Sequence, residues 1–158
     1  MSRSSQSPHE LVDGGQQYLE SAIQTASPAR LRLMLIERAV AVCDCLAESW
    51  KSESDLGCNE HSLKLLEIFG ELLAGVVCGK TKQEQDVCSK VADLYVFLTQ
   101  HLVAAESNSD VASVEEIKTV LEVEAETWRA VCLQDLQRDP ASAPSMTPSP
   151  SGGLNLEA

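Results

Sequence analysis

The sequence is poor in aromatic and basic residues and has no long apolar run. Of its 158 residues only 4% are aromatic, and 12 Lys and Arg stand against 24 Asp and Glu, for a formal net charge of -12. Phosphate backbones and anionic lipid surfaces select clustered Lys and Arg, so nucleic acid is not an expected partner. No segment approaches the roughly 18 apolar residues that a membrane span needs, and the N-terminus lacks the apolar block of a secretory signal. We therefore expect a soluble protein of the cytosol without a membrane span.

Proline is missing from the middle of the chain, between Ala29 and Asp139. Nothing there interrupts helix hydrogen bonding, so the whole middle can be helical. The two ends are instead rich in Ser, Gln, Pro and Gly and have few large apolar groups with which to offset the entropy of ordering. We expect three parts: a flexible N-terminal segment at 1–17, a four-helix domain at 18–136 and a disordered Pro/Ser-rich tail at 137–158.

Motifs for metal binding and catalysis are also missing. The six cysteines include no CxxC pair and the three histidines are scattered, so we expect no metal site and reduced thiols used as small side chains. The chain has no Gly-rich phosphate loop, no GxSxG, no HExxH, and no Glu-x-x-His pair of the kind found in di-iron bundles. We expect no cofactor and no enzymatic activity.

Apolar residues at helical spacing predict four amphipathic helices, of which two precede residue 80. The first begins at Ser27 and Pro28, where the hydroxyl caps the helix and proline takes the first helical position, and it runs to about Trp50. The second begins near Asn59 and carries apolar residues as far as Val77, with glycine near its end. A polar loop separates the two.

Two capping boxes predict the beginnings of the later helices. The third helix begins with Thr81 and Glu84, and the last with Ser113 and Glu116 and an apolar stripe that reaches Trp128. Connections between the predicted helices are short, which makes neighbouring helices antiparallel. The predicted fold class is all-α, an antiparallel up-down four-helix bundle, with a short extra N-terminal helix as an optional addition.

The first two predicted helices carry apolar arcs wider than one bundle contact requires. Such a helix is either central to the bundle or forms half of a groove that binds a partner. The groove candidates are apolar residues of these two helices, for which core packing is the alternative use: Leu33, Ile36, Val40, Leu65 and Phe69. We expect Leu94 and Trp128 to belong to the core.

Four segments in the same order resemble the FliS family of flagellar secretion chaperones. Residues 18–35, YLESAIQTASPARLRLML, are similar to the family's Tyr, its Thr-Ala-Ser-Pro turn and its Leu-x-x-Met-Leu pattern. Residues 66–72, LEIFGEL, resemble its second long helix, and residues 92–98, ADLYVFL, its Leu-Tyr-x-Tyr run. Residues 117–128 resemble its last helix, which ends in Trp. The resemblance covers most of the predicted folded part.

Single positions depart from the family pattern or carry two interpretations. The chain has Ile36 where family members commonly have Tyr, and in the third helix it has Phe97 at the second Tyr of the family's Leu-Tyr-x-Tyr run. Both changes remove a hydroxyl and keep an apolar surface. Tyr18 matches the family's N-terminal Tyr, which the resemblance places near a segment that covers the partner groove. Its alternative role is to attach the N-terminal segment to the bundle.

The resemblance implies a cytoplasmic export chaperone that binds the disordered C-terminal segment of flagellin. Such a chaperone prevents premature polymerisation and keeps its client competent for flagellar type III secretion. The groove candidates and Tyr18 would contact the flagellin segment, and components of the export apparatus are further candidate partners.

A dimeric structural or signalling bundle without a flagellar client is the alternative, and a bundle enzyme or metal carrier is a third. The number of client segments bound per chain distinguishes the chaperone from the dimeric bundle. The sequence is compatible with both a monomer and a homodimer.

Overall fold

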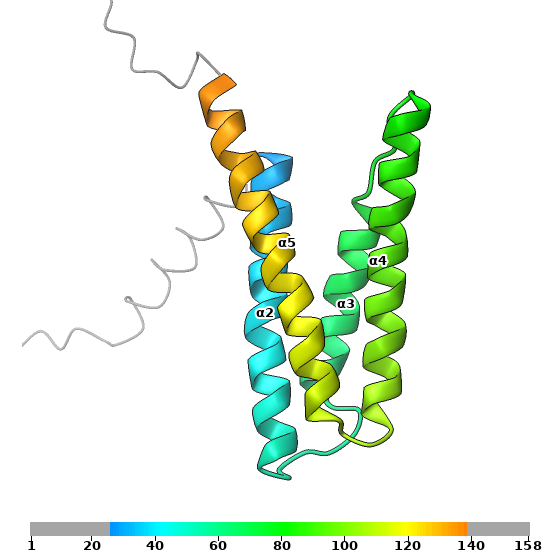
Figure 1. The fold of residues 1–158 in the computed structure, drawn as a ribbon. Helices are drawn as coiled ribbons and strands as arrows, with labels where there is room; N and C mark the ends of the chain where they lie inside the picture. The colour runs from blue at the N-terminus through cyan, green and yellow to red at the C-terminus, as the bar shows by residue number, and fades with distance from the viewer. Residues whose placement is uncertain (1–25, 139–158) are drawn as a thin grey trace, which may run out of the picture.

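The computed structural model describes residues 26–138, which form four helices (Figure 1). They are α2 (Pro28–Lys51), α3 (Glu60–Ala74), α4 (Lys82–Glu106) and α5 (Val111–Arg138). Successive helices run in opposite directions, α2 packs against α3 and α5, and α4 packs against the same two helices from the other side. The described part contains no strand. The predicted all-α, antiparallel up-down bundle is confirmed, while any extra N-terminal helix, the segment 1–17 and almost all of the tail lie outside the described residues.

Local chemistry at the helix starts explains where three of the four helices begin. The Ser27 side chain accepts a hydrogen bond from the Arg30 backbone N–H at 3.2 Å, and Pro28 follows as the first helical residue. Thr81 and Glu84 exchange side-chain and backbone bonds in the predicted capping box. Asn59 caps α3 in the same reciprocal way with its third-position residue, Ser62. These short-range patterns confirm the predicted starts.

Two helix boundaries differ from the predictions. Helix α5 begins at Val111 because the Asp110 carboxylate accepts from the backbone N–H of Ala112 at 3.0 Å and from the Ser113 hydroxyl at 2.8 Å. Ser113 is therefore a donor inside the first turn and not the cap. Helix α3 ends at Ala74, with Gly75 as its C-cap, so Val77 lies in the following loop with 89% of its surface exposed.

A single hydrophobic core runs along the axis of the bundle. Helix α2 contributes many of the buried residues because it faces both α3 and α5, which accounts for its wide apolar arc. The largest fully buried side chains come from all four helices: Leu33, Ile36, Leu46, Leu65, Phe69, Leu72, Tyr95, Leu98, Leu102, Val114, Ile117 and Leu121.

The two ends of the bundle are built differently. At one end the loop after α2 is fixed, because Trp50 Nε1 donates to the Gly57 carbonyl oxygen at 3.0 Å and the Gly57 N–H donates to Ser109 Oγ at 2.7 Å. At the other end α3 stops early: it has 15 residues, against 24, 25 and 28 in α2, α4 and α5. The helices therefore splay into two arms at that end, with α2 and α5 in one arm and α4 in the other (Figure 1).

Candidate partner-binding groove

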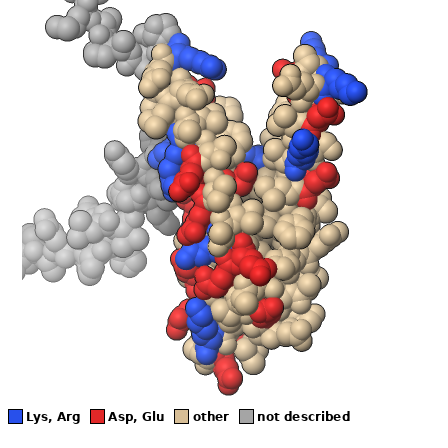
Figure 2. Space-filling view, in the orientation of Figure 1, with Lys and Arg blue, Asp and Glu red and all other residues tan. Residues whose placement is uncertain are grey.

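A groove occupies the open end of the bundle, in the space beyond the end of α3. It has a volume of about 930 Å³ and receives side chains from the first turns of α2, the last turn of α3, the loop after it, the first turns of α4, and α5. Figure 2 shows it as a notch between the two arms. We call this cavity the end groove; its lining residues are Pro28, Ala29, Leu31, Arg32, Leu35, Glu71, Leu72, Gly75, Val76, Val77, Gly79, Gln83, Glu84, Val87, Cys88, Val91 and Trp128.

Apolar side chains dominate the end groove although it opens to solvent. Val77 is 89% exposed and Val87 is 56% exposed, and Leu31, Leu35 and Trp128 are half-buried around them. A contiguous exposed apolar surface of this kind marks an interaction site in soluble proteins. The cavity also has the size of a ligand site, and because it opens to solvent between helices it suits a polypeptide segment as well.

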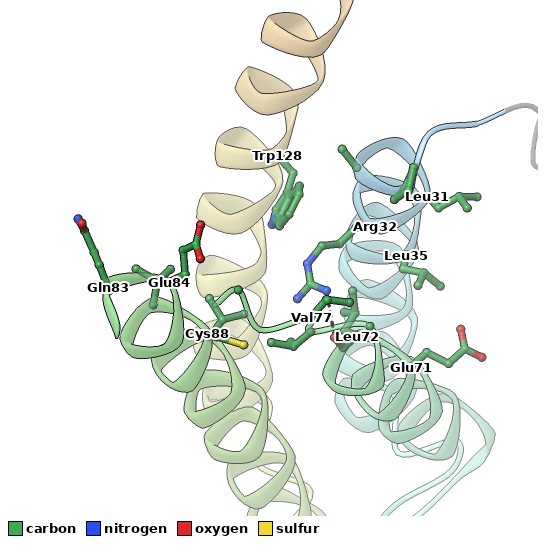
Figure 3. Close-up of a pocket in the computed structure, with 17 residues that line it drawn as sticks. Leu31, Arg32, Leu35, Glu71, Leu72, Val77, Gln83, Glu84, Cys88 and Trp128 are labelled. Carbon is green, nitrogen blue, oxygen red and sulfur yellow. Dashed lines mark hydrogen bonds between the residues drawn. The ribbon is translucent and has the colours of Figure 1, made fainter. Parts of the chain in front are cut away.

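Arg32 brings a positive charge into this apolar surface. Its Nη1 donates to the Leu72 carbonyl oxygen in the last turn of α3 at 3.0 Å. Its guanidinium carbon lies 5.2 Å from the centre of the Tyr95 ring and 5.1 Å from that of Trp128. Figure 3 shows the side chain reaching from α2 into the groove between Trp128 and Leu72. The aromatic faces and the helix C-terminus both stabilise a cation here.

The aromatic ring below Arg32 is itself held between two helices. Tyr95 of α4 is fully buried, and its hydroxyl donates to Glu124 Oε2 of α5 at 3.1 Å. Burial raises the pKa of Tyr95 to about 12, with the Arg32 charge acting in the opposite direction. The phenol is thus neutral at physiological pH and serves as a fixed ring and hydrogen-bond donor. Its neighbour Phe97, singled out in the sequence, is 54% exposed and stacks on His101 at 5.5 Å.

A disulfide that reaches the groove wall through Cys88 corrects the expectation of six reduced thiols. Cys78 of the loop after α3 bonds to Cys88 of α4, with their Cα atoms 5.5 Å apart. The loop returns along the first turns of α4 after Gly75 ends α3, which brings the two cysteines together despite a spacing without a motif. Cys43 is a free, buried thiol, as expected, and burial raises its pKa to about 12.

Four of the sequence-predicted groove residues lie in the core. Leu33, Ile36, Leu65 and Phe69 have at most 1% of their surface exposed, and none lines the end groove. These side chains point inward because the wide apolar faces of α2 and α3 pack against each other and against the other two helices. That these residues contact a partner stays a prediction, and in this conformation the helices would have to separate first.

The other predicted residues are placed differently. Val40 is half-buried and borders a second hollow of about 390 Å³, whose remaining lining includes Glu37, Glu122 and Arg129. Tyr18 lies outside the described residues. Of the two expected core residues, Leu94 and Trp128, both are half-buried and pack against the core, but Trp128 also lines the end groove.

Sequence reasoning missed the end groove itself. Arg32 lies between Leu31 and Leu33, but Arg30 lies two residues earlier, so the sequence alone does not single out Arg32. Gly75 was the available signal, because a helix that ends there cannot cover its longer neighbours to their ends.

Within 26–138 no helix is long and apolar enough to cross a bilayer. In the same range no three His, Cys, Asp or Glu side chains gather in a way that could hold a metal ion.

The fold defines a class: an antiparallel up-down four-helix bundle, here with an open apolar groove at one end. Comparison with known families gives a specific result. Residues 13–135 match the family described as Flagellar protein FliS, which covers well over half of the chain. The protein belongs to the FliS family, whose members are flagellar export chaperones and not enzymes. A comparison with curated proteins gives no match.

Proposed function

We propose that this chaperone binds the C-terminal segment of flagellin in the cytosol, with the end groove as a principal contact surface. The observation that carries the proposal is the exposed apolar lining of a groove of about 930 Å³ in a member of the FliS family. A flagellin segment that is disordered before assembly has apolar side chains to cover, and the groove offers apolar surface that no described residue covers. Shielding would prevent premature polymerisation and keep the client competent for type III secretion.

The shape of the groove favours a helical segment. Helix α3 has 15 residues against 24 in α2, and its last turn is bonded through Leu72 to Arg32 in the first turns of α2. At about 5.4 Å per turn, the space beyond α3 at this end accommodates a short helical segment of about one to two turns. An amphipathic segment placed there would complete four-helix packing and bury Leu31, Leu35 and Val87.

Two valines of nearly equal exposure provide a matched test. Val87 in the groove is 56% exposed and Val123 on α5, outside the groove, is 60% exposed, so aspartate at either position leaves the bundle folded. We expect Val87→Asp to weaken binding of a labelled flagellin C-terminal peptide by about tenfold or more, since a charge opposes burial of apolar surface. Val123→Asp is expected to bind like the original protein.

The oligomeric state is part of the same test. A chaperone is expected to bind one flagellin segment per chain, as measured by light scattering of the purified complex. If the protein is instead a homodimer whose chains cover each other's grooves, and no flagellin peptide binds, the alternative of a structural or signalling dimer replaces this proposal. If both valine variants bind the peptide equally well, the client surface lies elsewhere.

A further inference from the structure

The guanidinium of Arg32 has hydrogen-bond donors that no described residue satisfies. Nη1 is bonded to the Leu72 carbonyl oxygen, but Nε and Nη2 are buried without an acceptor among residues 26–138. An arginine has five N–H donors arranged as a planar fork, and the edge formed by Nε and Nη2 is the one that pairs with a carboxylate through two parallel bonds. Leaving such donors unpaired in a buried place is costly.

The position of Arg32 restricts what can supply the acceptor. The residue lies where the groove meets the last turn of α3, beside Leu72 and Gly75, and a hypothetical Cβ on Gly75 would lie 3.6 Å from Nη1. A segment that enters from the open end and continues the line of α3 therefore has to end, or turn away, at Arg32. Trp128 and Tyr95 flank the guanidinium from α5 and α4, with their ring centres 5.1 and 5.2 Å from its carbon.

The chemistry of helix ends then selects the direction of the segment. A helix N-terminus presents N–H donors, which cannot pair with the donors of Arg32, whereas a C-terminus presents carbonyl oxygens and a carboxylate. The carbonyl groups at the end of α3 carry partial negative charge and would repel a second C-terminus. Arg32 lies between the two and bonds to the first of them already.

We propose that Arg32 is a specificity-determining residue that binds the free C-terminal carboxylate of the client segment. The segment would lie in the end groove with its last turn directed toward the end of α3. The carboxylate would accept from Nε and Nη2 of Arg32 while Nη1 keeps its bond to Leu72. This inference rests on the proposed binding of a flagellin C-terminal segment and adds which end of that segment is recognised, and by which atoms.

The test compares two flagellin C-terminal peptides of the same sequence, one with a free C-terminal carboxylate and one with a C-terminal amide. Binding is measured by isothermal titration calorimetry to the full-length protein, so no change to the fold is involved. We expect the amide to bind about tenfold or more weakly, as the loss of hydrogen bonds to a charged group implies.

Variants of the protein assign the effect to Arg32. Arg32→Gln is expected to bind both peptides with the same reduced affinity, so that the two changes are not additive. Arg32→Lys keeps the charge without the planar fork and is expected to recover only part of the preference. Arg30→Gln is the matched control, because Arg30 is exposed on the same helix and does not line the groove.

The outcomes separate this inference from the proposed function. If neither peptide binds, the proposed function fails and this inference fails with it. If both peptides bind equally well, the chaperone function stands and the role of Arg32 is overturned. If the two peptides bind equally well, and both bind more tightly after deletion of residues 1–17, the groove is assigned to the chain's own N-terminal segment. This result would also overturn the role of Arg32. If affinity falls when an acidic side chain of the peptide is replaced, and not when its C-terminal carboxylate is amidated, the assignment to the C-terminal carboxylate is overturned.

Discussion

Arg32 and Leu72 join the first turns of α2 to the last turn of α3, through a bond of 3.0 Å between Nη1 and the carbonyl oxygen. The last carbonyl groups of a helix lack partners within the helix, so this bond satisfies one of them from outside. The same side chain thereby marks the end of α3 and forms the base of the end groove. The cavity exists because α3 is short, and Arg32 determines the charge at its closed side.

Aspartate at two buried positions is expected to unfold the bundle. Ile36 and Phe69 have 0% and 1% of their surface exposed, so Ile36→Asp or Phe69→Asp would bury an unpaired charge and lower the free energy of unfolding by more than about 4 kcal/mol. Circular dichroism during thermal denaturation measures the loss. Val123→Asp, on an exposed position, is the control. Folded, stable Ile36→Asp and Phe69→Asp variants would show that these residues face a groove and not the core.

Reduction of the Cys78–Cys88 disulfide is expected to destabilise the protein. The bond closes a loop with a sequence separation of 10, for which chain entropy gives about 3 kcal/mol in the unfolding free energy. Urea denaturation with and without a reductant measures the difference, and the double variant Cys78→Ser, Cys88→Ser should match the reduced protein. The exposed Cys45 and Cys58 provide a control double variant. Equal stability in all samples, with an intact mass that shows six thiols, would contradict the disulfide.

The helix cap at Asp110 predicts a specific pH dependence. Its hydrogen bond from Ser113 lowers the pKa of the carboxyl below its ordinary value of 3.8, and the backbone N–H of Ala112 acts in the same direction. Because the pKa is lower in the folded than in the unfolded chain, the carboxylate stabilises the fold fully above the unfolded-state value. This stabilisation is lost as the pH falls through the folded-state pKa.

Asp110→Asn tests this dependence, because asparagine also caps helices but does not titrate. The melting temperature of the original protein is expected to exceed that of the variant near neutral pH. The difference should shrink as the pH falls below about 4, where the unfolded-state carboxyl takes up its proton. A difference that stays constant with pH would contradict the assignment of the cap to the carboxylate.

Thiol labelling distinguishes Cys43 from the exposed cysteines. Burial raises the pKa of Cys43 to about 12, with the neighbouring Asp44 acting in the same direction, so almost none of it is thiolate at pH 8. Iodoacetamide is expected to modify Cys45 and Cys58 in the native protein and to leave Cys43 unmodified until denaturant is added. Peptide mass spectrometry identifies the sites. Rapid modification of native Cys43 would show that the interface between α2 and α5 opens readily.

The sequence predicts this fold well where the signals are local. Ser27 and Pro28, and likewise Thr81 and Glu84, act over one turn, so their roles are visible without tertiary information. At the last helix two local patterns competed, and the carboxylate of Asp110 forms the cap instead of the hydroxyl of Ser113. Carboxylate and hydroxyl are both good caps, and the sequence pattern alone does not rank them.

The groove was harder to predict than the fold. A wide apolar arc looks the same whether it faces other helices or a partner, so Ile36 and Phe69 fitted a groove as well as a core. The groove depends on the relative lengths of helices far apart in the chain, above all on the end of α3 at Ala74. The Cys78–Cys88 bond depends equally on the path of the loop after α3, which no spacing rule predicts.

The most direct test of the groove as client site uses the fluorescence of Trp128. The chain has two tryptophans: Trp128 lines the end groove, and Trp50 is buried at the opposite end with 3% of its surface exposed. Titration with a flagellin C-terminal peptide that lacks tryptophan should move the emission of Trp128 to shorter wavelength, because the peptide covers the ring. The change should saturate at one peptide per chain and be absent in a Trp128→Phe variant that still binds. Peptide binding without any change in the emission of Trp128 would contradict the end groove as the client site.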